Sequence, residues 1–484
     1  MTTVGPRLTR CITALILSLV FASIPLFAAQ QAAAQAAASA AGLPAGQVIE
    51  SVPCEGDPTQ SYSLYLPTAY TPFRKWPIIY AFDPVARGRV PVMLFKEVAE
   101  KYGYILAGSN NSRNFSLADS SRGMNAMWQD THARLSLDPR RVYTTGFSGG
   151  ARVAGLMAFR CLQCQIVGVI AHGAGYPGNH KATDRDGLLY FLAVGDEDFN
   201  WPEVITVRRE REEEGLAYRV LTFHGPHQWA PVEIFEDAVE WLQLKAMQAG
   251  SLAPDQAFLA GMFQKAQAAA GDAKKRGDAI AELSAYRLLV ADLKGLKDTS
   301  ESEKKLQALK ASSTLKDALK KEQDQITAQY SLVGELSAKV AALGESNGEE
   351  AVTMRGEIVQ GMNQLKGQAA HARNEEKRTL YARSFNALWA QGIEAGQSQF
   401  EVHNFAAAQT YFELMAELKD DPWPSLLLAE TRTAMGNRKQ AIKDLREAAK
   451  RGLKNAEFLE KDARLEALHT DPEFQKLLAE LRSK

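Results

Sequence analysis

Gly146-Phe147-Ser148-Gly149-Gly150 decides the fold because of the segments on either side of it. Residues 141–145 are β-branched and aromatic, which is typical of a buried strand, and residues 151–159 have the composition of a helix. A Gly-x-Ser-x-Gly pentapeptide between a strand and a helix predicts a nucleophile elbow, a sharp turn that exposes the serine hydroxyl above a sheet. Glycines suit this turn because side chains would collide with the neighbouring strand and helix. The first helical turn also directs free N–H groups at the place where an oxyanion would form.

Acidic residues and histidines follow two later strand-like runs, in the chain order serine, acid, histidine. The apolar run 188–194 leads into Gly195-Asp196-Glu197-Asp198, and the run 218–223 leads into His224-Gly225-Pro226-His227. Open α/β sheets place their sites beyond the carboxyl ends of the strands, so both clusters are expected near the serine. A serine hydroxyl needs an imidazole to take its proton and a carboxylate to orient that imidazole. Each cluster offers two candidates for its role.

With this elbow and these acid and histidine clusters, the chain resembles the serine esterases of the α/β-hydrolase superfamily, in particular the polyhydroxybutyrate depolymerase and feruloyl esterase type. The resemblance rests on residues 138–143 leading into the elbow, on Gly195-x-x-Asp198 before the acid, and on Gly225-Pro226-His227-Gln228-Trp229 around the base. It covers roughly residues 48–245, about half of the chain. It implies an α/β fold, a mainly parallel sheet with helices on both faces.

The resemblance also implies the roles of the site residues. Ser148 would be the nucleophile, Asp198 rather than Asp196 the acid, and His227 rather than His224 the base. The implied activity is hydrolysis of a carboxylic ester through an acyl-enzyme. A serine peptidase is an alternative, since the same triad cleaves amides.

The chain departs from these esterases at the second donor of the oxyanion hole. Such enzymes usually carry His-Gly after the strand that precedes the first helix, whereas Phe82-Asp83-Pro84-Val85 follows that strand here. Pro84 has no N–H to donate. The hole is therefore expected to use the Gly149 N–H together with that of Asp83 or Val85. Both remain candidates.

Three polar or aromatic residues are candidates for the substrate cleft. Asn110 and Asn111 follow the strand-like run 104–107, and Trp229 stands two residues after the predicted base. A polar loop without contact to substrate is the alternative for the two asparagines.

Length and charge limit the classes of protein. A chain of 484 residues is too long for one compact core and predicts two or three domains. A net charge of −1 with 23% charged residues gives no electrostatic basis for a nucleic-acid partner. Neither a cofactor nor a metal site is indicated. An ester substrate is the expected ligand.

The N-terminal segment 1–36 is typical of a secretory signal followed by alanines. Arg7 and Arg10 precede an apolar run at 12–27, and cleavage is plausible near Ala29, Ala34 or Ala36. The run is short for a transmembrane helix. We therefore expect a periplasmic or secreted protein with no stable membrane span after cleavage.

Removal of that segment leaves Cys54, Cys161 and Cys164. An oxidising compartment favours a structural disulfide, with buried thiols as the alternative. The sequence does not show which two cysteines would pair.

The character of the chain changes near residue 250, after which Ala, Leu, Lys, Glu and Gln dominate and helices are expected. Asn404 and Asn437 lie 33 residues apart and open similar segments, which resembles the period of tetratricopeptide repeats. The domains are accordingly expected at 45–247 (hydrolase), 250–380 (helical hairpin and connector) and 385–484 (tetratricopeptide-like).

The helical half suggests two further expectations. A stripe at heptad-like spacing is interpreted as one face of an ordinary amphipathic helix; it comprises Leu319, Ile326, Val333, Leu336, Val340 and Leu343. The helices are expected to pack mainly on one another and to bind a protein partner, leaving the hydrolase half able to work alone. One alternative to independent halves is that the helices cap the cleft as a lid. The alternative to an enzyme is a catalytically silent hydrolase fold that serves as a scaffold.

Overall fold

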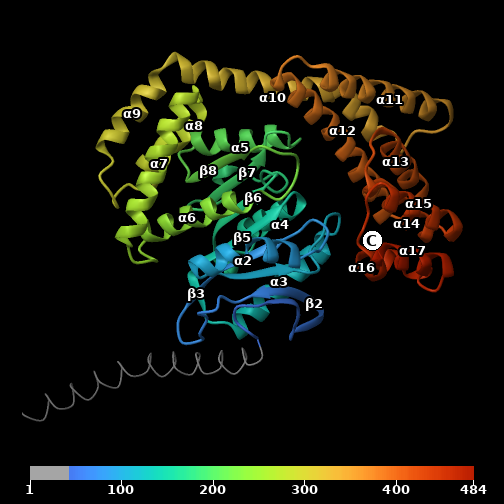
Figure 1. Ribbon diagram of the computed structural model, residues 1–484, viewed down its shortest axis with the longest axis horizontal. Coiled ribbons are helices and arrows are strands. Elements are labelled where there is room, and N and C mark those ends of the chain that lie inside the picture. Colours follow the sequence, from blue (N-terminus) through green and yellow to red (C-terminus); the bar gives the residue numbers. More distant parts are fainter. Residues whose placement is uncertain (1–42, 484) are drawn as a thin grey trace, which may run out of the picture.

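The computed structural model describes residues 43–483. The predicted signal at 1–36 lies outside the described residues. A sheet domain is followed by a long run of helices, residues 250–483, which we call the helical arm and which arches over the sheet domain from one side to the other (Figure 1). No helix among residues 43–483 is both long enough and apolar enough to cross a membrane.

The sheet has eight strands in the order β1-β2-β4-β3-β5-β6-β7-β8. β1 and β2 pair antiparallel, β2 pairs antiparallel with β4, and all the other pairs are parallel. This order, with helices on both faces, is the α/β-hydrolase fold, which confirms the predicted fold class. The strands are β1 (Val48–Cys54), β2 (Asp57–Tyr65), β3 (Trp76–Phe82), β4 (Ile105–Ser109), β5 (Leu137–Phe147), β6 (Ile166–His172), β7 (Leu189–Gly195) and β8 (Tyr218–Phe223).

Two apolar clusters fill the two faces of the sheet. Because successive side chains of a strand point to opposite faces, Ile78 and Tyr80 of β3 enter one cluster and Ile79 enters the other. Helices α3, α4 and α5 contribute to the first cluster, and α2 and α6 contribute to the second. These helices are α2 (Arg89–Tyr102), α3 (Leu117–Arg134), α4 (Gly149–Arg160), α5 (Trp201–Glu213) and α6 (Val232–Gln248).

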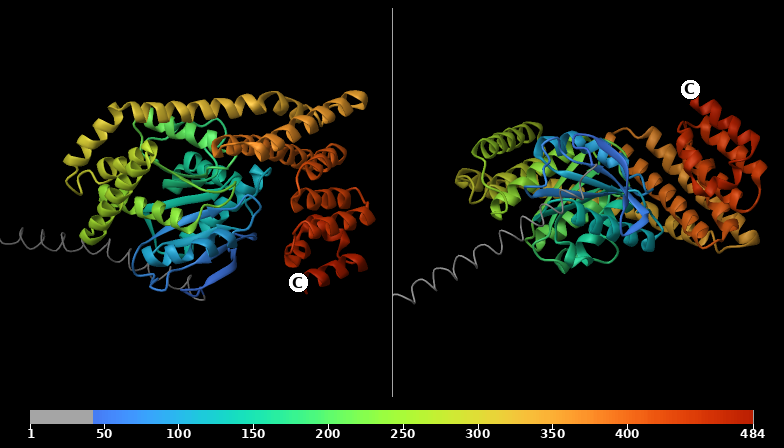
Figure 2. Two further views of the ribbon diagram at one scale, coloured as in Figure 1. Left: turned by 45° about the horizontal axis from the view of Figure 1, so that its top comes forward. Right: turned by 90° about the horizontal axis from the view of Figure 1, so that it is seen from below.

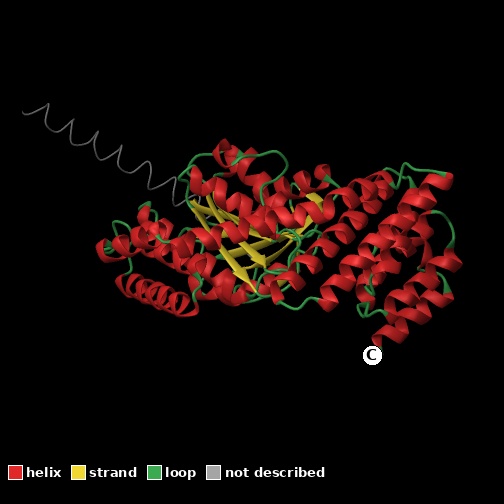
Figure 3. Cartoon of the chain, turned by 90° about the horizontal axis from the view of Figure 1, so that it is seen from above, coloured by secondary structure: helices red, strands yellow, loops and turns green. Residues whose placement is uncertain are grey.

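The helical arm contains no strand within its described residues (Figure 3) and follows directly after α6 in the chain. Leu244 and Met247 of α6 pack with Leu259 and Met262 of α7, which anchors the first hairpin of the arm. The arm comprises α7 (Gln256–Arg276), α8 (Ala279–Arg287), α9 (Ser300–Ala311), α10 (Ser313–Ala342), α11 (Gly348–His371), α12 (Glu375–Glu401), α13 (Phe405–Leu418), α14 (Pro422–Ala434), α15 (Arg438–Lys450), α16 (Ala456–Lys461) and α17 (Pro472–Arg482).

The long helix α10 connects three parts of the molecule (Figure 2). Its predicted apolar stripe packs on three clusters in turn: Leu319 against the α8–α9 region, Ile326 in the core of the sheet domain, and Val340 in the core formed by α10 to α13. The stripe is therefore one face of an amphipathic helix, as interpreted from its sequence.

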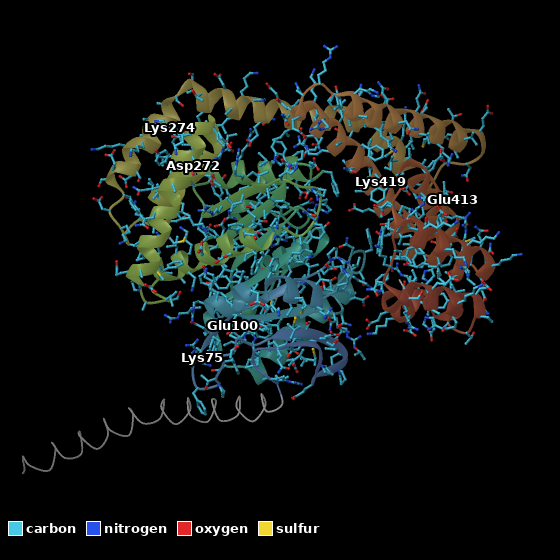
Figure 4. All side chains as sticks on the ribbon, viewed as in Figure 1. Lys75, Glu100, Asp272, Lys274, Glu413 and Lys419 are labelled. Atoms are coloured by element: carbon cyan, nitrogen blue, oxygen red, sulfur yellow. A yellow bond between two sulfur atoms is a disulfide. The ribbon has the colours of Figure 1, made fainter. Side chains whose placement is uncertain are left out.

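The last helices pack on one another in succession. Asn404 stands at the N-cap of α13, where its side chain accepts from the Ala407 N–H, and Asn437 holds the equivalent N-cap position of α15. Trp389 of α12 donates to the Met415 carbonyl of α13 at 3.1 Å. Lys419, labelled in Figure 4, places its ammonium 4.2 Å from the centroid of the Trp389 ring. These contacts fix α13 against α12.

Polar contacts join the arm to the sheet domain. Gln329 of α10 donates to the Phe199 carbonyl at 2.9 Å, and Arg383 of α12 donates to the Asp196 carbonyl at 3.0 Å. The Glu322 carboxylate of α10 pairs with Arg208 of α5. The apolar stripes of the arm do pack mainly on each other, but its polar face covers the loops after β7. The arrangement departs from the expectation of two independent halves.

The cysteines resolve the pairing that the sequence left open. Cys161 and Cys164 form a disulfide just after α4, and Cys54 is a free, buried thiol. Within residues 43–483, no group of three or more His, Cys, Asp and Glu side chains is arranged to hold a metal ion.

Candidate active site

Ser148 stands on the sharp turn between β5 and α4 with φ 53° and ψ −123°, a backbone conformation that non-glycine residues rarely adopt. Its N–H donates to the His172 carbonyl of β6 at 2.9 Å, which fixes the turn to the neighbouring strand. A Cβ at Gly150 would lie 2.1 Å from the Phe82 carbonyl oxygen, and one at Gly146 would lie 2.2 Å from that of Gly150. The turn therefore requires both glycines.

The structure brings Ser148, His227 and Asp198 together in a hydrogen-bonded chain. His227 Nε2 lies 2.9 Å from Ser148 Oγ, and His227 Nδ1 lies 2.9 Å from each carboxylate oxygen of Asp198. Asp198 is fully buried and also accepts from the Asn200 N–H at 2.8 Å. In this arrangement the imidazole can take the hydroxyl proton while the carboxylate holds its other nitrogen.

The ends of β6, β7 and β8 lie side by side, and a glycine after β6 leaves space for this chain of hydrogen bonds. Asp198 follows β7, His227 follows β8, and Gly173 follows β6 with φ 63°. A Cβ at Gly173 would lie 2.8 Å from Asp198 Oδ2 and 3.1 Å from His227 Nδ1. The Asn200 amide donates to the Gly173 carbonyl at 2.8 Å. Sequence reasoning missed Gly173, because its segment carries no recognisable pattern.

The alternative acid and base candidates pair with each other instead. His224 Nδ1 lies 3.1 Å from Asp196 Oδ2, and the other Asp196 oxygen accepts from the Gly225 N–H at 3.0 Å. The hydrogen bond to Asp196 raises the pKa of His224, which is exposed. This second pair lies on the surface, whereas His227 and Asp198 form the hydrogen-bonded chain with Ser148.

Aromatic rings enclose the imidazole. The ring centroids of Phe147 and Phe199 lie 4.5 and 4.3 Å from that of His227. Trp229 packs against Phe147 and donates its indole N–H to Asp83 Oδ2 at 3.1 Å. Trp229 thus supports the loop that carries His227.

The three candidate donors of the oxyanion hole differ in whether the backbone N–H already has a hydrogen-bond partner. Gly149 opens α4, and first-turn N–H groups have no partner within a helix. The Val85 N–H donates to the Asp83 carboxylate at 3.1 Å, which also binds the Arg87 guanidinium. The Asp83 backbone nitrogen lies 3.2 Å from the place where a Gly150 Cβ would stand, beside the elbow.

The structure places Asn110 and Asn111 away from the serine. Asn111 Oδ1 accepts from the Ser61 N–H of β2 at 2.8 Å, and Asn110 donates to the Glu50 carbonyl of β1 and to the Ser61 hydroxyl of β2. Both asparagines line a separate hollow of about 240 Å³. The antiparallel strand β2, which pairs with β4, binds these side chains and keeps them from the proposed cleft.

A cavity of about 530 Å³ opens at Ser148 and is built by both halves of the chain. The sheet domain contributes the elbow and the loops after β4 and β7, and the arm contributes residues of α10 and α12. The lining residues are Asn114, Phe115, Ser148, Gly149, Arg152, Phe199, Asn200, Glu203, Tyr330, Ala387, Ala390, Gln391 and Glu394. Sequence reasoning found Ser148 and Gly149, and Asn114 belongs to the polar loop 108–114 that it considered for the cleft; it did not predict the others as part of the cleft. No local pattern marks the residues of the arm.

Comparison with known proteins yields matches among solved structures only. No protein-family model and no curated protein matches the chain. A ferulic acid esterase shares 15% identity over 40% of this chain and 95% of its own, with a TM-score of 0.32. The S-formylglutathione hydrolase FrmB of Staphylococcus aureus shares 12% over 40% and 96%, with a TM-score of 0.34. Esterase 2 of Thermogutta terrifontis shares 13% over 44% and 97%, with a TM-score of 0.33. These values concern the fold alone.

Proposed function

We propose that this protein is a serine hydrolase that cleaves a carboxylic ester. The observation that carries the proposal is the unbroken chain from Ser148 Oγ through His227 to the buried Asp198, with every link at 2.9 Å. Fold alone does not define a function, but this site has the geometry that acyl transfer needs.

The proposed reaction proceeds in two balanced halves. Ser148 Oγ attacks the ester carbonyl carbon while His227 Nε2 takes its proton, and the carbonyl oxygen becomes an oxyanion. Collapse of this intermediate breaks the bond to the alcohol, which leaves with the proton from His227 and produces an acyl-enzyme. Water then repeats the steps, giving its proton to His227, releasing the acid and restoring the hydroxyl.

We assign the oxyanion hole to the N–H groups of Gly149 and Asp83. Gly149 lies at the start of α4, where the helix directs free donors towards the serine. Asp83 is favoured over Val85 because the Val85 N–H already donates to a carboxylate.

The experiment that tests this function measures turnover of a panel of chromogenic esters by the purified protein. Ser148→Ala serves as the control, since it removes the nucleophile and leaves the fold. Hydrolysis by the wild type and not by the variant is the expected result. A chromogenic anilide panel run beside it tests the peptidase alternative. A folded wild type that cleaves neither class would favour the scaffold alternative.

Export to a periplasmic or extracellular location is part of the proposal. The disulfide between Cys161 and Cys164 supports it, because disulfides persist in oxidising compartments. Cell fractionation with N-terminal sequencing of the mature protein tests it, and a mature protein found in the cytoplasm would contradict it.

The tetratricopeptide-like character of residues 385–484, and a protein partner bound there, are also proposals. The equivalent N-cap positions of Asn404 and Asn437 support the repeat. We also propose domain boundaries near residues 250 and 385. The first is supported by the change from strands and helices to helices alone after α6.

A further inference from the structure

One face of α12 covers the cavity that opens at Ser148. Ala387, Ala390, Gln391 and Glu394 line this cavity, and their spacing of three and four residues places them on the same side of the helix. Tyr330 of α10 completes the wall contributed by the arm. Two small alanines leave space, so the polar groups that α12 presents to a substrate are those of Gln391 and Glu394.

The other charged groups of the cavity already have partners. Arg152 and Glu203 form a two-pronged ion pair with N–O distances of 2.6 and 2.9 Å. Glu203 also accepts from the Gly175 N–H at 3.1 Å, and Arg152 donates to the Tyr176 carbonyl at 3.2 Å. This pair adds no net charge to the cavity.

Glu394 is the remaining charged group of the lining. Among residues 43–483, no group lies within hydrogen-bonding or ion-pair distance of its carboxylate, although the side chain is open to solvent through the cavity. The surrounding protein raises its pKa, while Arg152 and His227 oppose that shift. Without a partner of its own, this carboxylate can pair with a cation that enters the cavity.

Aromatic rings stand around the same space. Phe115, Phe199 and Tyr330 line the cavity, and the exposed fractions of Phe115 and Tyr330 are 38% and 53%. Available ring faces attract alkylammonium groups through the negative charge of the π system, and desolvation strengthens this attraction. A carboxylate in a cavity that also has aromatic rings in its wall is chemistry suited to an organic cation.

We propose that the cavity selects esters that carry an ammonium group close to the scissile carbonyl, and that Glu394 binds that cation. This inference rests on the proposed ester hydrolysis. The helical arm thereby supplies the residue that determines specificity, while the sheet domain supplies the nucleophile.

A matched pair of substrates tests the inference by kinetics. One para-nitrophenyl ester carries a trimethylammonium group at the end of a short acyl chain, and its isostere carries a tert-butyl group of the same shape without charge. A second pair places the same two groups on the alcohol instead. The wild type should prefer the charged member of at least one pair. Glu394→Gln should reduce that ratio of kcat/KM about tenfold, mainly through KM, which corresponds to roughly 1.4 kcal/mol.

Glu375→Gln is the control, since Glu375 lies at the exposed start of α12 and pairs with Arg378. It should keep the wild-type ratio. A wild type that hydrolyses both members of each pair equally would overturn the inference while leaving the hydrolase function intact.

A binding measurement separates this inference from the proposed function. Calorimetry on Ser148→Ala measures the affinity for the uncleaved trimethylammonium ester, with Ser148→Ala/Glu394→Gln as the comparison. Weaker binding by the double variant supports the cation site even if the wild type hydrolyses no ester. Equal affinity of the two proteins, or no binding by either, would overturn it.

Discussion

The two halves of the chain contribute to the active site in different ways. In the sheet domain, buried strands place Ser148, Asp198 and His227 at one edge, so the relay is a direct product of the fold. The helical arm has its own apolar clusters and meets that edge through polar groups. Under the proposed function, the sheet domain sets the chemistry of the site and the arm selects the substrate.

The largest expected effect is on the relay of the sheet domain. Ser148→Ala and His227→Ala should each lower kcat on a chromogenic ester by about 10⁴ to 10⁶-fold, because the members of a triad act as a unit. The double variant should be hardly slower than either single variant. Steady-state kinetics on the folded proteins measures all three.

His224→Ala is the matched control for this prediction. His224 lies three residues before His227 and pairs at the surface with Asp196, so its removal should leave kcat within about twofold, an estimate based on the small effects of exposed residues. Losses that add in the Ser148/His227 double variant, or a large loss in His224→Ala, would contradict the proposed relay.

The second largest effect is expected where a helix of the arm enters the core of the sheet domain. Ile326 of α10 is buried in the apolar cluster of the sheet domain. Ile326→Ala should lower the free energy of unfolding by about 2–4 kcal/mol, since it removes buried methyl groups and leaves a cavity. Denaturant titration followed by circular dichroism measures this change.

Val352→Ala is the control, because Val352 of α11 is 73% exposed. Its effect should stay within about 0.5 kcal/mol. An effect of Ile326→Ala as small as that of Val352→Ala would mean that α10 does not share the core of the sheet domain.

The third prediction concerns the contact between α12 and the loop that carries Asp198. Arg383 is buried, donates to the Asp196 carbonyl at 3.0 Å, and lies 4.3 Å from the centroid of the Trp201 ring. Burial lowers the pKa of its guanidinium to about 10. Arg383→Met should lower kcat about tenfold with a smaller change in KM, because small displacements of catalytic groups are costly.

Arg378→Met, on the exposed part of α12, should leave both constants unchanged. If Arg383→Met lowered the melting temperature without changing kcat, Arg383 would have a structural role only.

The smallest effect expected is on the pH dependence of cation selection. Because the protein around the cavity raises the pKa of Glu394, its carboxylate is protonated at a higher pH than an ordinary glutamate. The preference for the ammonium ester over its isostere should therefore be full at high pH and decline as the pH falls, starting above the usual glutamate range.

The groups around Glu394 are Arg152 of α4, Glu203 of α5, Tyr330 of α10 and His227 after β8. Protonation of His227 slows both esters alike, so the ratio of their kcat/KM values isolates Glu394. A ratio that does not change between pH 4 and pH 8, the window around the ordinary glutamate pKa, would contradict the prediction.

The part of the site that the sequence predicts is the part that local patterns encode. The strand-like runs that precede Ser148, Asp198 and His227 are each visible within about ten residues of sequence. A parallel sheet places the carboxyl ends of such strands side by side. Asn110 ends a strand as well, but the antiparallel neighbour β2 binds its side chain. That pairing depends on the order of strands in space.

The arm illustrates the limit of such reasoning more strongly. Glu394 lies more than 160 residues after His227 and stands in an ordinary amphipathic segment. It reaches the site only because α12 packs across α10 and contacts the loop after β7 through Arg383. The polar face of a helix looks the same in sequence whether it meets water or a substrate.

The most direct test of the proposed function is covalent labelling of the full chain with a fluorophosphonate probe, followed by peptide mass spectrometry. An activated serine attacks phosphorus and retains the probe, whereas an ordinary serine does not. We expect one label per chain, on Ser148, and its loss in His227→Ala. A folded protein that takes no label, or takes it on another serine, would contradict the proposed function.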